Sequence, residues 1–535
     1  MNILGISGGV KIGNQEGAAA LLVDGKLVAA AEEERFVGIK FANGLLPKHA
    51  TKFCLQQAGI GIKDLDAVVF AGATYDDFEE ILRRFFGLNF GHAPPIRLVD
   101  HHRAHAASTF YGSGWEHALV VTIDRSGDRK STTVSIGQNG RLKTLEEIYK
   151  PNSLGIFYSA VTQFLGFQTD SDEYKVMGMA GYGTPCHDFS KILEVTDTGY
   201  HFHHEFITGI SADKPGPSKQ ERLFDSFPLP FSPRIPGSPI SQDHFDIAAS
   251  AQHQLEQAVL RLIGSYVAST GVGRVCLAGG VTLNSLMNQK IRQMDCIEQL
   301  YIPPICSDAG LALGAAYLHC VEHGTIPDPL KHAYWGPEFT SAEIRTVLDR
   351  TGVSYTEISD PVEAAVERIS QGRIIGWFQG RMEYGPRALG NRSILANPQE
   401  PTMKDVINAK VKFREEFRPL APSVLHEAGA EYFENYADSP FMTETFPAKE
   451  VIATRAPAVV HVDGTSRLQS VHRETNPLYA ELISAVEKQT GIPVVLNTSF
   501  NAYNDPIACE PYQALRTLFA TGLDSLVIGD FVLDK

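Results

Sequence analysis

The 535-residue sequence has few cysteines and no C-x-x-C pair. Its seven cysteines are scattered and odd in number, which argues against a secreted disulfide framework. No apolar run approaches the roughly 20 residues that a membrane span requires. Met1 to Val10 lacks the basic stretch and long apolar core of a secretory signal. These absences predict a protein of the reducing cytoplasm with no membrane partner.

Positive charge is also scarce, and the formal net charge is −15. An acidic chain has no long-range attraction to nucleic acid, so no nucleic-acid partner is expected. Hydrophobic residues make up 43% and charged residues 20%, which predicts globular domains with sizeable cores. The length favours two or more domains.

Strand-like and helical patterns alternate along the chain, which predicts an α/β fold. Asn2 to Ser7 is a short apolar run, and Asp24-Gly25 between two further runs is a hairpin signal. The other runs that indicate strands are Ala18 to Val23, Lys26 to Ala31, Ala67 to Ala71, Ala118 to Ile123 and Val275 to Ala278. No internal sequence repeat is visible.

Two proline-containing stretches interrupt these patterns. Residues 212–241 are rich in Pro and Ser and predict a surface insertion or a lid. Ile326 to Pro337 follows a helical segment, Ala309 to Glu322, and is the best candidate boundary. We therefore expect one domain at 1–336 and another at 337–535.

A histidine pair precedes an alanine-rich helical pattern. His101 and His105 are four residues apart, so a helix places both on one face, while His102 points elsewhere. Such a pair commonly holds a divalent metal, although solvated histidines on a capped helix are the alternative.

Two aspartates strengthen the metal interpretation. Asp124 ends a predicted strand and Asp308 lies at the start of a helix, where sites of α/β sheets gather. A turn role for Asp124 and a capping role for Asp308 are the alternatives. Two His and two carboxylates suit a divalent metal such as Fe²⁺.

A glycine turn follows the strand Val275 to Ala278. Gly279 and Gly280 permit close backbone approach, and Asn284 follows as a helical pattern opens. Helix N-termini attract anions, so this turn is a candidate for phosphate or adenine contacts.

The second half contains a local excess of positive charge. Between Arg373 and Arg418 there are nine Lys or Arg against five Asp or Glu. Arginine binds phosphate in a bidentate manner, so the cluster is a candidate pocket for a nucleotide or phosphorylated substrate. A solvated helix face is the alternative, except at Arg387, where Gly385-Pro386 and Gly390 mark tight turns.

Polar residues follow a predicted buried strand near the end of the chain. Gly491 to Leu496 delivers Asn497 to Asn501 at its end, which is typical either of ligand contacts or of a capped turn. Arg467 is an isolated cation beside small residues.

Taken in order, these motifs resemble the O-carbamoyltransferase family that includes the nodulation-factor and antibiotic-biosynthesis carbamoyltransferases. The resemblance runs nearly end to end. Its most specific segments are Ala31 to Phe36, His101 to His105, Glu173 to Gly178, Glu383 to Arg392, Phe417 to Pro422 and Asn497 to Asn501.

The resemblance implies an N-terminal domain of the actin/hexokinase-like type and a C-terminal domain like the YrdC nucleotide-binding fold. It implies that the C-terminal site makes carbamoyl-adenylate from carbamoyl phosphate and ATP, with Mg²⁺ accompanying the nucleotide. The N-terminal site would then transfer the carbamoyl group to the hydroxyl of a small molecule beside a bound metal, typically iron.

Residue roles follow from the same resemblance. The metal ligands would be His101, His105, Asp124 and Asp308, and the adenylate-forming contacts would be Arg387, Arg392, Lys412, Arg418, Arg467, Asn497 and Ser499. His101, His105, Asp124, Lys412 and Arg418 would act in catalysis. Relatives carry a His-Asp pair after the first strand, whereas this chain has Lys11 to Gly17 there, with Glu16 as a substitute candidate for a base.

Three rival functions stay open. They are threonylcarbamoyl transfer to tRNA, which the acidic charge disfavours, hydrogenase-type carbamoyl transfer to a cysteine, and a kinase or ATP-binding protein of the actin-like fold. The absence of C-x-x-C opposes the second, and the basic second half is unexplained by the third. The oligomeric state is open between a monomer and a homodimer.

Overall fold

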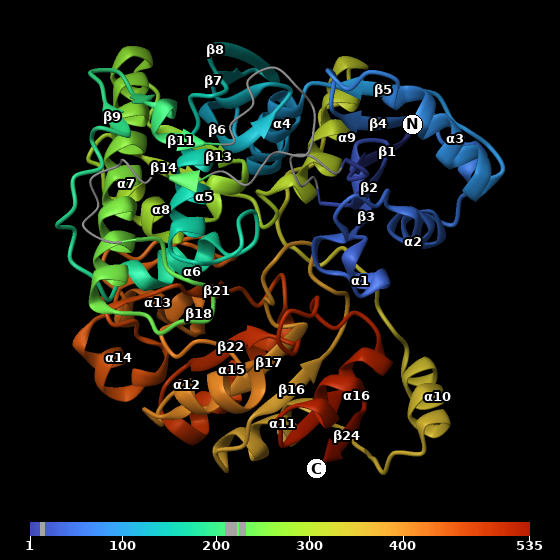
Figure 1. Cartoon of the computed structure of the whole chain (residues 1–535). Helices are drawn as coiled ribbons and strands as arrows, with labels where there is room; N and C mark the ends of the chain where they lie inside the picture. The colour runs from blue at the N-terminus through green and yellow to red at the C-terminus, as the bar shows by residue number, and fades with distance from the viewer. Residues whose placement is uncertain (11–15, 209–221, 224–231) are drawn as a thin grey trace. The chain divides into compact units, whose positions relative to one another are not determined.

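A computed structural model describes residues 1–10, 16–208, 222–223 and 232–535 of the chain. It divides into two compact units (Figure 1). The first comprises Met1–Glu33 and Phe41–Leu330, and the second comprises Glu34–Lys40 and Lys331–Lys535. Most of the Pro-rich stretch 212–241 lies outside the described residues. In the part of the chain that is described, no helix is long and apolar enough to span a bilayer.

The first unit begins with a five-stranded sheet in the order β3-β2-β1-β4-β5. The hairpin predicted at Asp24-Gly25 is confirmed, and both residues have the positive φ, 50° and 80°, that a tight primed turn requires. The strands are β1 (Asn2–Ser7), β2 (Ala18–Val23), β3 (Lys26–Glu32), β4 (Ala67–Ala71) and β5 (Ile96–Val99).

A second five-stranded sheet repeats this topology in the order β8-β7-β6-β13-β14. In each sheet the first strand pairs antiparallel with the next and parallel with the fourth. The strands are β6 (His117–Gly127), β7 (Lys130–Gln138), β8 (Arg141–Tyr149), β13 (Arg274–Ala278) and β14 (Gln299–Tyr301). This duplicated α/β arrangement is the actin/hexokinase-like fold that the resemblance implies.

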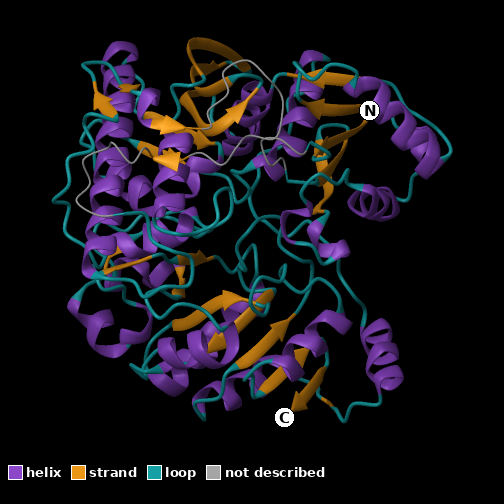
Figure 2. Cartoon of the chain, in the orientation of Figure 1, coloured by secondary structure: helices purple, strands orange, loops and turns teal. Residues whose placement is uncertain are grey.

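Helices connect and cover these two sheets (Figure 2). They are α2 (Lys48–Ala58), α3 (Phe78–Phe90), α4 (His101–Ser113), α5 (Leu154–Phe164), α6 (Glu173–Ala180), α7 (Gln242–Thr270), α8 (Ser285–Arg292) and α9 (Leu311–Glu322). Short strands β9 (Leu193–Val195) and β10 (Tyr200–Phe202) form a hairpin, and β11 (Ile207–Thr208) pairs with β12 (Arg222–Leu223).

Helices α4 and α9 occupy equivalent places in the two halves, after β5 and after β14, and they pack directly on each other. Glycine makes this close approach feasible. A Cβ atom on Gly314 of α9 would stand 1.9 Å from the carbonyl oxygen of Ala104 in α4. The contact brings the starts of the two helices into one region of the unit.

The second unit is built on an eight-stranded mixed sheet, ordered β15-β24-β23-β16-β17-β22-β18-β21. Its strands are β15 (Thr356–Glu357), β16 (Ile375–Phe378), β17 (Arg392–Ala396), β18 (Ala421–Leu425), β21 (Gln469–Val471), β22 (Val494–Ser499), β23 (Ser525–Ile528) and β24 (Phe531–Asp534). A separate pair joins β19 (Phe446–Pro447) to β20 (Thr465–Ser466).

Alternate strand residues feed two cores on opposite faces of this sheet. Ile375 and Trp377 pack with α11 and α15, whereas Phe378 packs in the core that α10 and α16 join. The helices are α1 (Glu34–Val37), α10 (Ser341–Thr351), α11 (Pro361–Ser370), α12 (Met403–Val406), α13 (Gly429–Tyr432), α14 (Glu450–Arg455), α15 (Pro477–Thr490) and α16 (Pro511–Ala520). A π-helix spans Ile407–Lys412.

The short segment Glu34–Lys40 belongs to the second unit although it lies early in the sequence. The Arg35 guanidinium donates to the carbonyl of Gly385 at 2.8 Å, and Gln513 donates to the Arg35 carbonyl at 3.1 Å. The boundary between the two units therefore falls between Leu330 and Lys331. The chain also passes from the first unit to the second before Glu34 and returns to the first after Lys40. The roles of the two domains, and the likeness of the second to the YrdC fold, stay predictions.

Candidate functional site

The first two turns of α4 carry His101 and His105 on one buried face, as their spacing predicts. Asp100 caps the helix by accepting a hydrogen bond from the Arg103 amide at 2.9 Å. The two imidazole centroids lie 4.8 Å apart. His102 points elsewhere and bonds Thr122 Oγ1 through Nδ1 at 2.7 Å.

Asp124 and Asp308 meet these imidazoles from the other half of the first unit. His101 Nε2 lies 3.2 Å from Asp124 Oδ2 and 3.6 Å from Asp308 Oδ1. His105 Nε2 lies 3.4 Å from Asp308 Oδ1. One ligand atom from each residue lies within 4.8 Å of the others, and all four residues are buried. The structure thus gathers the four predicted metal-ligand positions into one cluster, hereafter the His/Asp cluster.

The chemistry of the cluster fits a divalent cation. Both ring nitrogens of His105 are buried and have no hydrogen-bond partner among the described residues. Burial of two carboxylates beside two imidazoles is costly unless a positive charge compensates them. Two nitrogen and two oxygen donors suit a divalent transition ion such as Fe²⁺ or Zn²⁺.

The buried charges of the cluster shift the pKa values of its members in different directions. Burial favours neutral His101, but the hydrogen bond to Asp124 and the nearby carboxylates outweigh burial and raise the pKa of His101 to about 9. Burial and His101 lower the pKa of His105 well below its usual range. Burial and Asp124 raise the pKa of Asp308 well above its usual range.

Asp128, which the sequence analysis does not single out, positions the cluster. Its Oδ2 accepts from the amides of His101 at 2.8 Å and Ala73 at 2.9 Å, and its Oδ1 accepts from the amide and the hydroxyl of Thr74. Burial opposes its ionisation, but these hydrogen bonds outweigh burial and lower its pKa. Asp128 fixes the first residue of α4.

The glycine turn after β13 lies against this cluster. The Gly280 amide donates to Asp124 Oδ1 at 3.1 Å, and Gly279 has a φ of 97°. Asn284 Oδ1 caps α8 through the Met287 amide and also accepts from Gln252. The turn therefore orients Asp124, and its phosphate or adenine contacts stay a prediction.

Glu16 lies beside the same region. Its Oε2 accepts from Ser307 Oγ at 2.5 Å and from the Ala309 amide at 3.1 Å, on either side of Asp308 in sequence. Its charge also raises the pKa of Asp308. Residues 11–15 of the segment that departs from the relatives lie outside the described residues.

Arg467 lies within electrostatic range of Arg387, Arg414 and Arg418 in the second unit, and these four residues are hereafter the converging cations. Burial, then the charges of Arg387, Arg414 and Arg418, lower the pKa of Arg467 well below its usual range. Arg467 is half-buried in the loop between β20 and β21, while Arg387 lies in the loop after β16. All four side chains are half-buried, and Arg418 Nη1 lies 3.8 Å from Glu415 Oε2. Several guanidiniums near one another suit an anion with several oxygens, such as phosphate.

Lys412 adds a fifth cation at the end of the π-helix. Its ammonium donates to Ser499 Oγ at 3.1 Å and to Asn501 Oδ1 at 2.6 Å, and it also contacts the Ser499 carbonyl. Burial, then Arg414, Arg418 and Lys40, lower its pKa well below its usual range. Lys40 comes from the early segment Glu34–Lys40, and nothing in its sequence surroundings marks it as part of this group.

Two further predicted nucleotide contacts, Arg392 and Asn497, bond groups of the protein itself. Arg392 is buried, and its Nη1 and Nη2 donate to the carbonyls of Gln379, Gly380, Asn391 and Pro337. Its guanidinium also stacks 3.6 Å from the Phe378 ring centroid. Asn497 is buried within β22, which runs to Ser499 because its polar end still pairs with β17. Both residues stabilise the loop framework around Arg387, and their nucleotide contacts stay predictions.

Fold and site together define an α/β protein of the actin/hexokinase-like class with a buried His/Asp cluster. Family descriptions match in two places, "Carbamoyltransferase N-terminus" at residues 77–317 and "Carbamoyltransferase C-terminus" at residues 366–535. The chain belongs to the carbamoyltransferase family.

Two relatives are similar to this chain over nearly its whole length. The chain is 38% identical to nodulation protein NolNO of Sinorhizobium fredii over 97% of its own length and 79% of that protein. It is 35% identical to the uncharacterized protein sll1178 of Synechocystis, covering 100% of this chain and 97% of the relative.

Among solved structures, HypF of T. kodakarensis is similar at 15% identity and a TM-score of 0.34. That similarity covers 60% of this chain and 48% of HypF.

Proposed function

We propose that the protein is an O-carbamoyltransferase that activates the carbamoyl group with ATP. The second unit would form carbamoyl-adenylate, and the first would transfer the carbamoyl group to a hydroxyl of a small-molecule acceptor. The proposal is carried by the convergence of Arg467, Arg387, Arg414 and Arg418 in a chain whose net charge is −15. No nucleic-acid partner is proposed.

The activation step consumes carbamoyl phosphate, water and ATP. Hydrolysis of carbamoyl phosphate gives phosphate and carbamate, and a carbamate oxygen attacks the α-phosphorus of ATP. The bond between the α-phosphorus and the bridging oxygen breaks, and pyrophosphate leaves with Mg²⁺. Arg418 and Arg467 would stabilise the charge that accumulates on the phosphoryl oxygens. Lys412, held by Ser499 and Asn501, would keep its ammonium in a fixed direction.

The transfer step is assigned to the His/Asp cluster in the first unit. His101, His105, Asp124 and Asp308 would hold a divalent ion, which supplies Lewis-acid polarisation of the carbamoyl oxygen when bound. The acceptor hydroxyl attacks the carbamoyl carbon, the bond from that carbon to the phosphate oxygen of the adenylate breaks, and AMP leaves. The hydroxyl proton passes to water. Asp128 and Gly280 orient the ligands His101 and Asp124.

The test separates this activity from that of a kinase. The full chain is incubated with ATP, Mg²⁺ and carbamoyl phosphate, and the products are separated by anion exchange. We expect pyrophosphate and phosphate whose release depends on carbamoyl phosphate. Release of ADP without pyrophosphate would contradict the proposal. Mass spectrometry with candidate hydroxylated acceptors then scores the gain of one carbamoyl group.

A further inference from the structure

A second group of metal-ligating side chains lies in the second unit, outside the converging cations. Strands β18 and β21 run parallel, with Leu425 opposite Val471. The residue after each strand is a histidine, His426 and His472, so the register places the two imidazoles side by side. Their ring centroids are 4.2 Å apart and the rings are inclined by 26°.

A carboxylate completes the group. Asp438 Oδ1 lies 2.8 Å from His472 Nε2 and 3.4 Å from His426 Nδ1. One ligand atom of each of the three residues lies within 4.8 Å of the others. The side chains of His426, Asp438 and His472 are 40%, 48% and 25% exposed, so an ion can reach them from solvent.

The loop that carries Asp438 is held in place on both sides. Ser470 Oγ accepts from the Ser439 amide at 3.0 Å and contacts Tyr436 Oη at 2.8 Å. Ser470 belongs to β21 and lies two residues before His472. The same strand therefore presents one imidazole and fixes the loop of the carboxylate, which preorganises the three donors.

We propose that His426, Asp438 and His472 form a second divalent-metal site that takes Zn²⁺, with water completing the coordination. Zinc bonds of about 2.0–2.1 Å at a tetrahedral angle separate neighbouring ligand atoms by about 3.3 Å. The separation of 3.4 Å between Asp438 and His426 meets this value. Binding replaces the 2.8 Å hydrogen bond between Asp438 and His472 with two metal bonds.

The contact of Tyr436 with His426 does not oppose binding. Tyr436 Oη lies 3.0 Å from His426 Nδ1, but the same hydroxyl can donate to Ser470 Oγ instead. An ion at this site joins the ends of two strands to the Asp438 loop. The strand β21 follows Arg467 after one residue, so the ion also stabilises the strand next to the converging cations. The inference does not depend on the proposed function.

The test compares Zn²⁺ binding by full-length variants in equilibrium dialysis, with the metal counted by mass spectrometry. We expect the variant carrying both His426→Gln and His472→Gln to bind one equivalent fewer than the unaltered protein. The His/Asp cluster of the first unit is a constant background in every variant. His203→Gln is the control, because His203 contacts Glu194 at 3.1 Å but has no place in this group.

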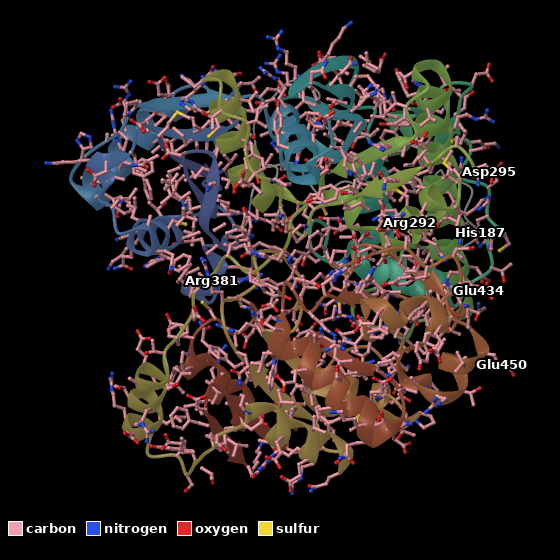
Figure 3. The ribbon with its side chains drawn as sticks, turned by 180° about the vertical axis from the view of Figure 1, so that it is seen from behind. His187, Arg292, Asp295, Arg381, Glu434 and Glu450 are labelled. Carbon is pink, nitrogen blue, oxygen red and sulfur yellow. The ribbon has the colours of Figure 1, made fainter. Side chains whose placement is uncertain are left out.

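A milder variant keeps the result interpretable if the double variant does not fold. Asp438→Asn retains an acceptor for His472 and should weaken Zn²⁺ binding by about tenfold or more. Glu434→Gln is its matched control from the same loop, and Figure 3 shows Glu434 at the surface. Equal stoichiometry in the unaltered protein and the folded double variant, or equal affinity in Asp438→Asn and Glu434→Gln, overturns the proposal.

Discussion

Gly127 lies directly against the imidazole of His101. A Cβ atom on Gly127 would stand 2.1 Å from Cγ of that ring, well inside van der Waals contact. Gly127 ends β6, three residues after Asp124. The absence of a side chain at this position therefore makes room for a ligand of the His/Asp cluster.

Gly127→Ala should displace His101 and weaken metal retention. Overpacking of this kind typically costs about 1–3 kcal/mol of the free energy of unfolding. Thermal unfolding and the iron or zinc content of the purified variant measure the two effects. Gly87→Ala is the control, because a Cβ there meets nothing within 4 Å. Full metal content in Gly127→Ala would contradict the assigned position of His101.

His105→Ala should abolish carbamoyl transfer while leaving pyrophosphate release largely intact, because His105 and the cations belong to different units. The assays are metal analysis, acceptor mass spectrometry and pyrophosphate release on one preparation. His92→Ala, at an exposed position, is the control. Full transfer by a metal-free His105→Ala protein would refute the role of the cluster.

Arg418→Ala should lower carbamoyl-phosphate-dependent pyrophosphate release by a factor of about 10² to 10³, the usual effect of removing a group that stabilises transition-state charge. Arg467→Lys should also lose activity, because lysine keeps the charge but not the bidentate geometry. Arg350→Ala, exposed on α10, should be neutral. Unchanged release by Arg418→Ala would remove this residue from the activation step.

Asp534 gives a stability prediction with a defined pH window. The hydrogen bonds from Arg368, with smaller help from Ser525, lower its pKa to about 2. Its stabilising effect is therefore complete above the unfolded pKa near 4 and is lost as the pH falls towards 2. Asp534→Asn should lower stability at pH 7, and the difference from the unaltered protein should shrink below pH 4. Urea unfolding over this range measures it; a constant difference would contradict the prediction.

The sequence predicted features that depend on local spacing. The His101–His105 pair and the Asp24-Gly25 hairpin follow from helix periodicity and turn chemistry, and both are confirmed. The sequence does not predict the repeated sheet topology, because two sheets can share a topology without sharing residues. The roles of Asp128 and Lys40 could not be predicted either, because their partners are distant in sequence. Arg392 and Arg467 are the same residue type, and only packing shows which one faces backbone carbonyls.

The assignment of Glu34–Lys40 to the second unit has a consequence for biogenesis. The ribosome synthesises Glu34–Lys40 nearly three hundred residues before Lys331. The rest of the second unit, which this segment contacts, therefore does not yet exist when the segment emerges. The second unit must therefore close a very long loop, which is an entropically slow event. A truncated chain beginning at Lys331 would lack both the anchor from Arg35 to Gly385 and the charge of Lys40. Supplying Glu34–Lys40 as a separate peptide would then be expected to restore order around Gly385.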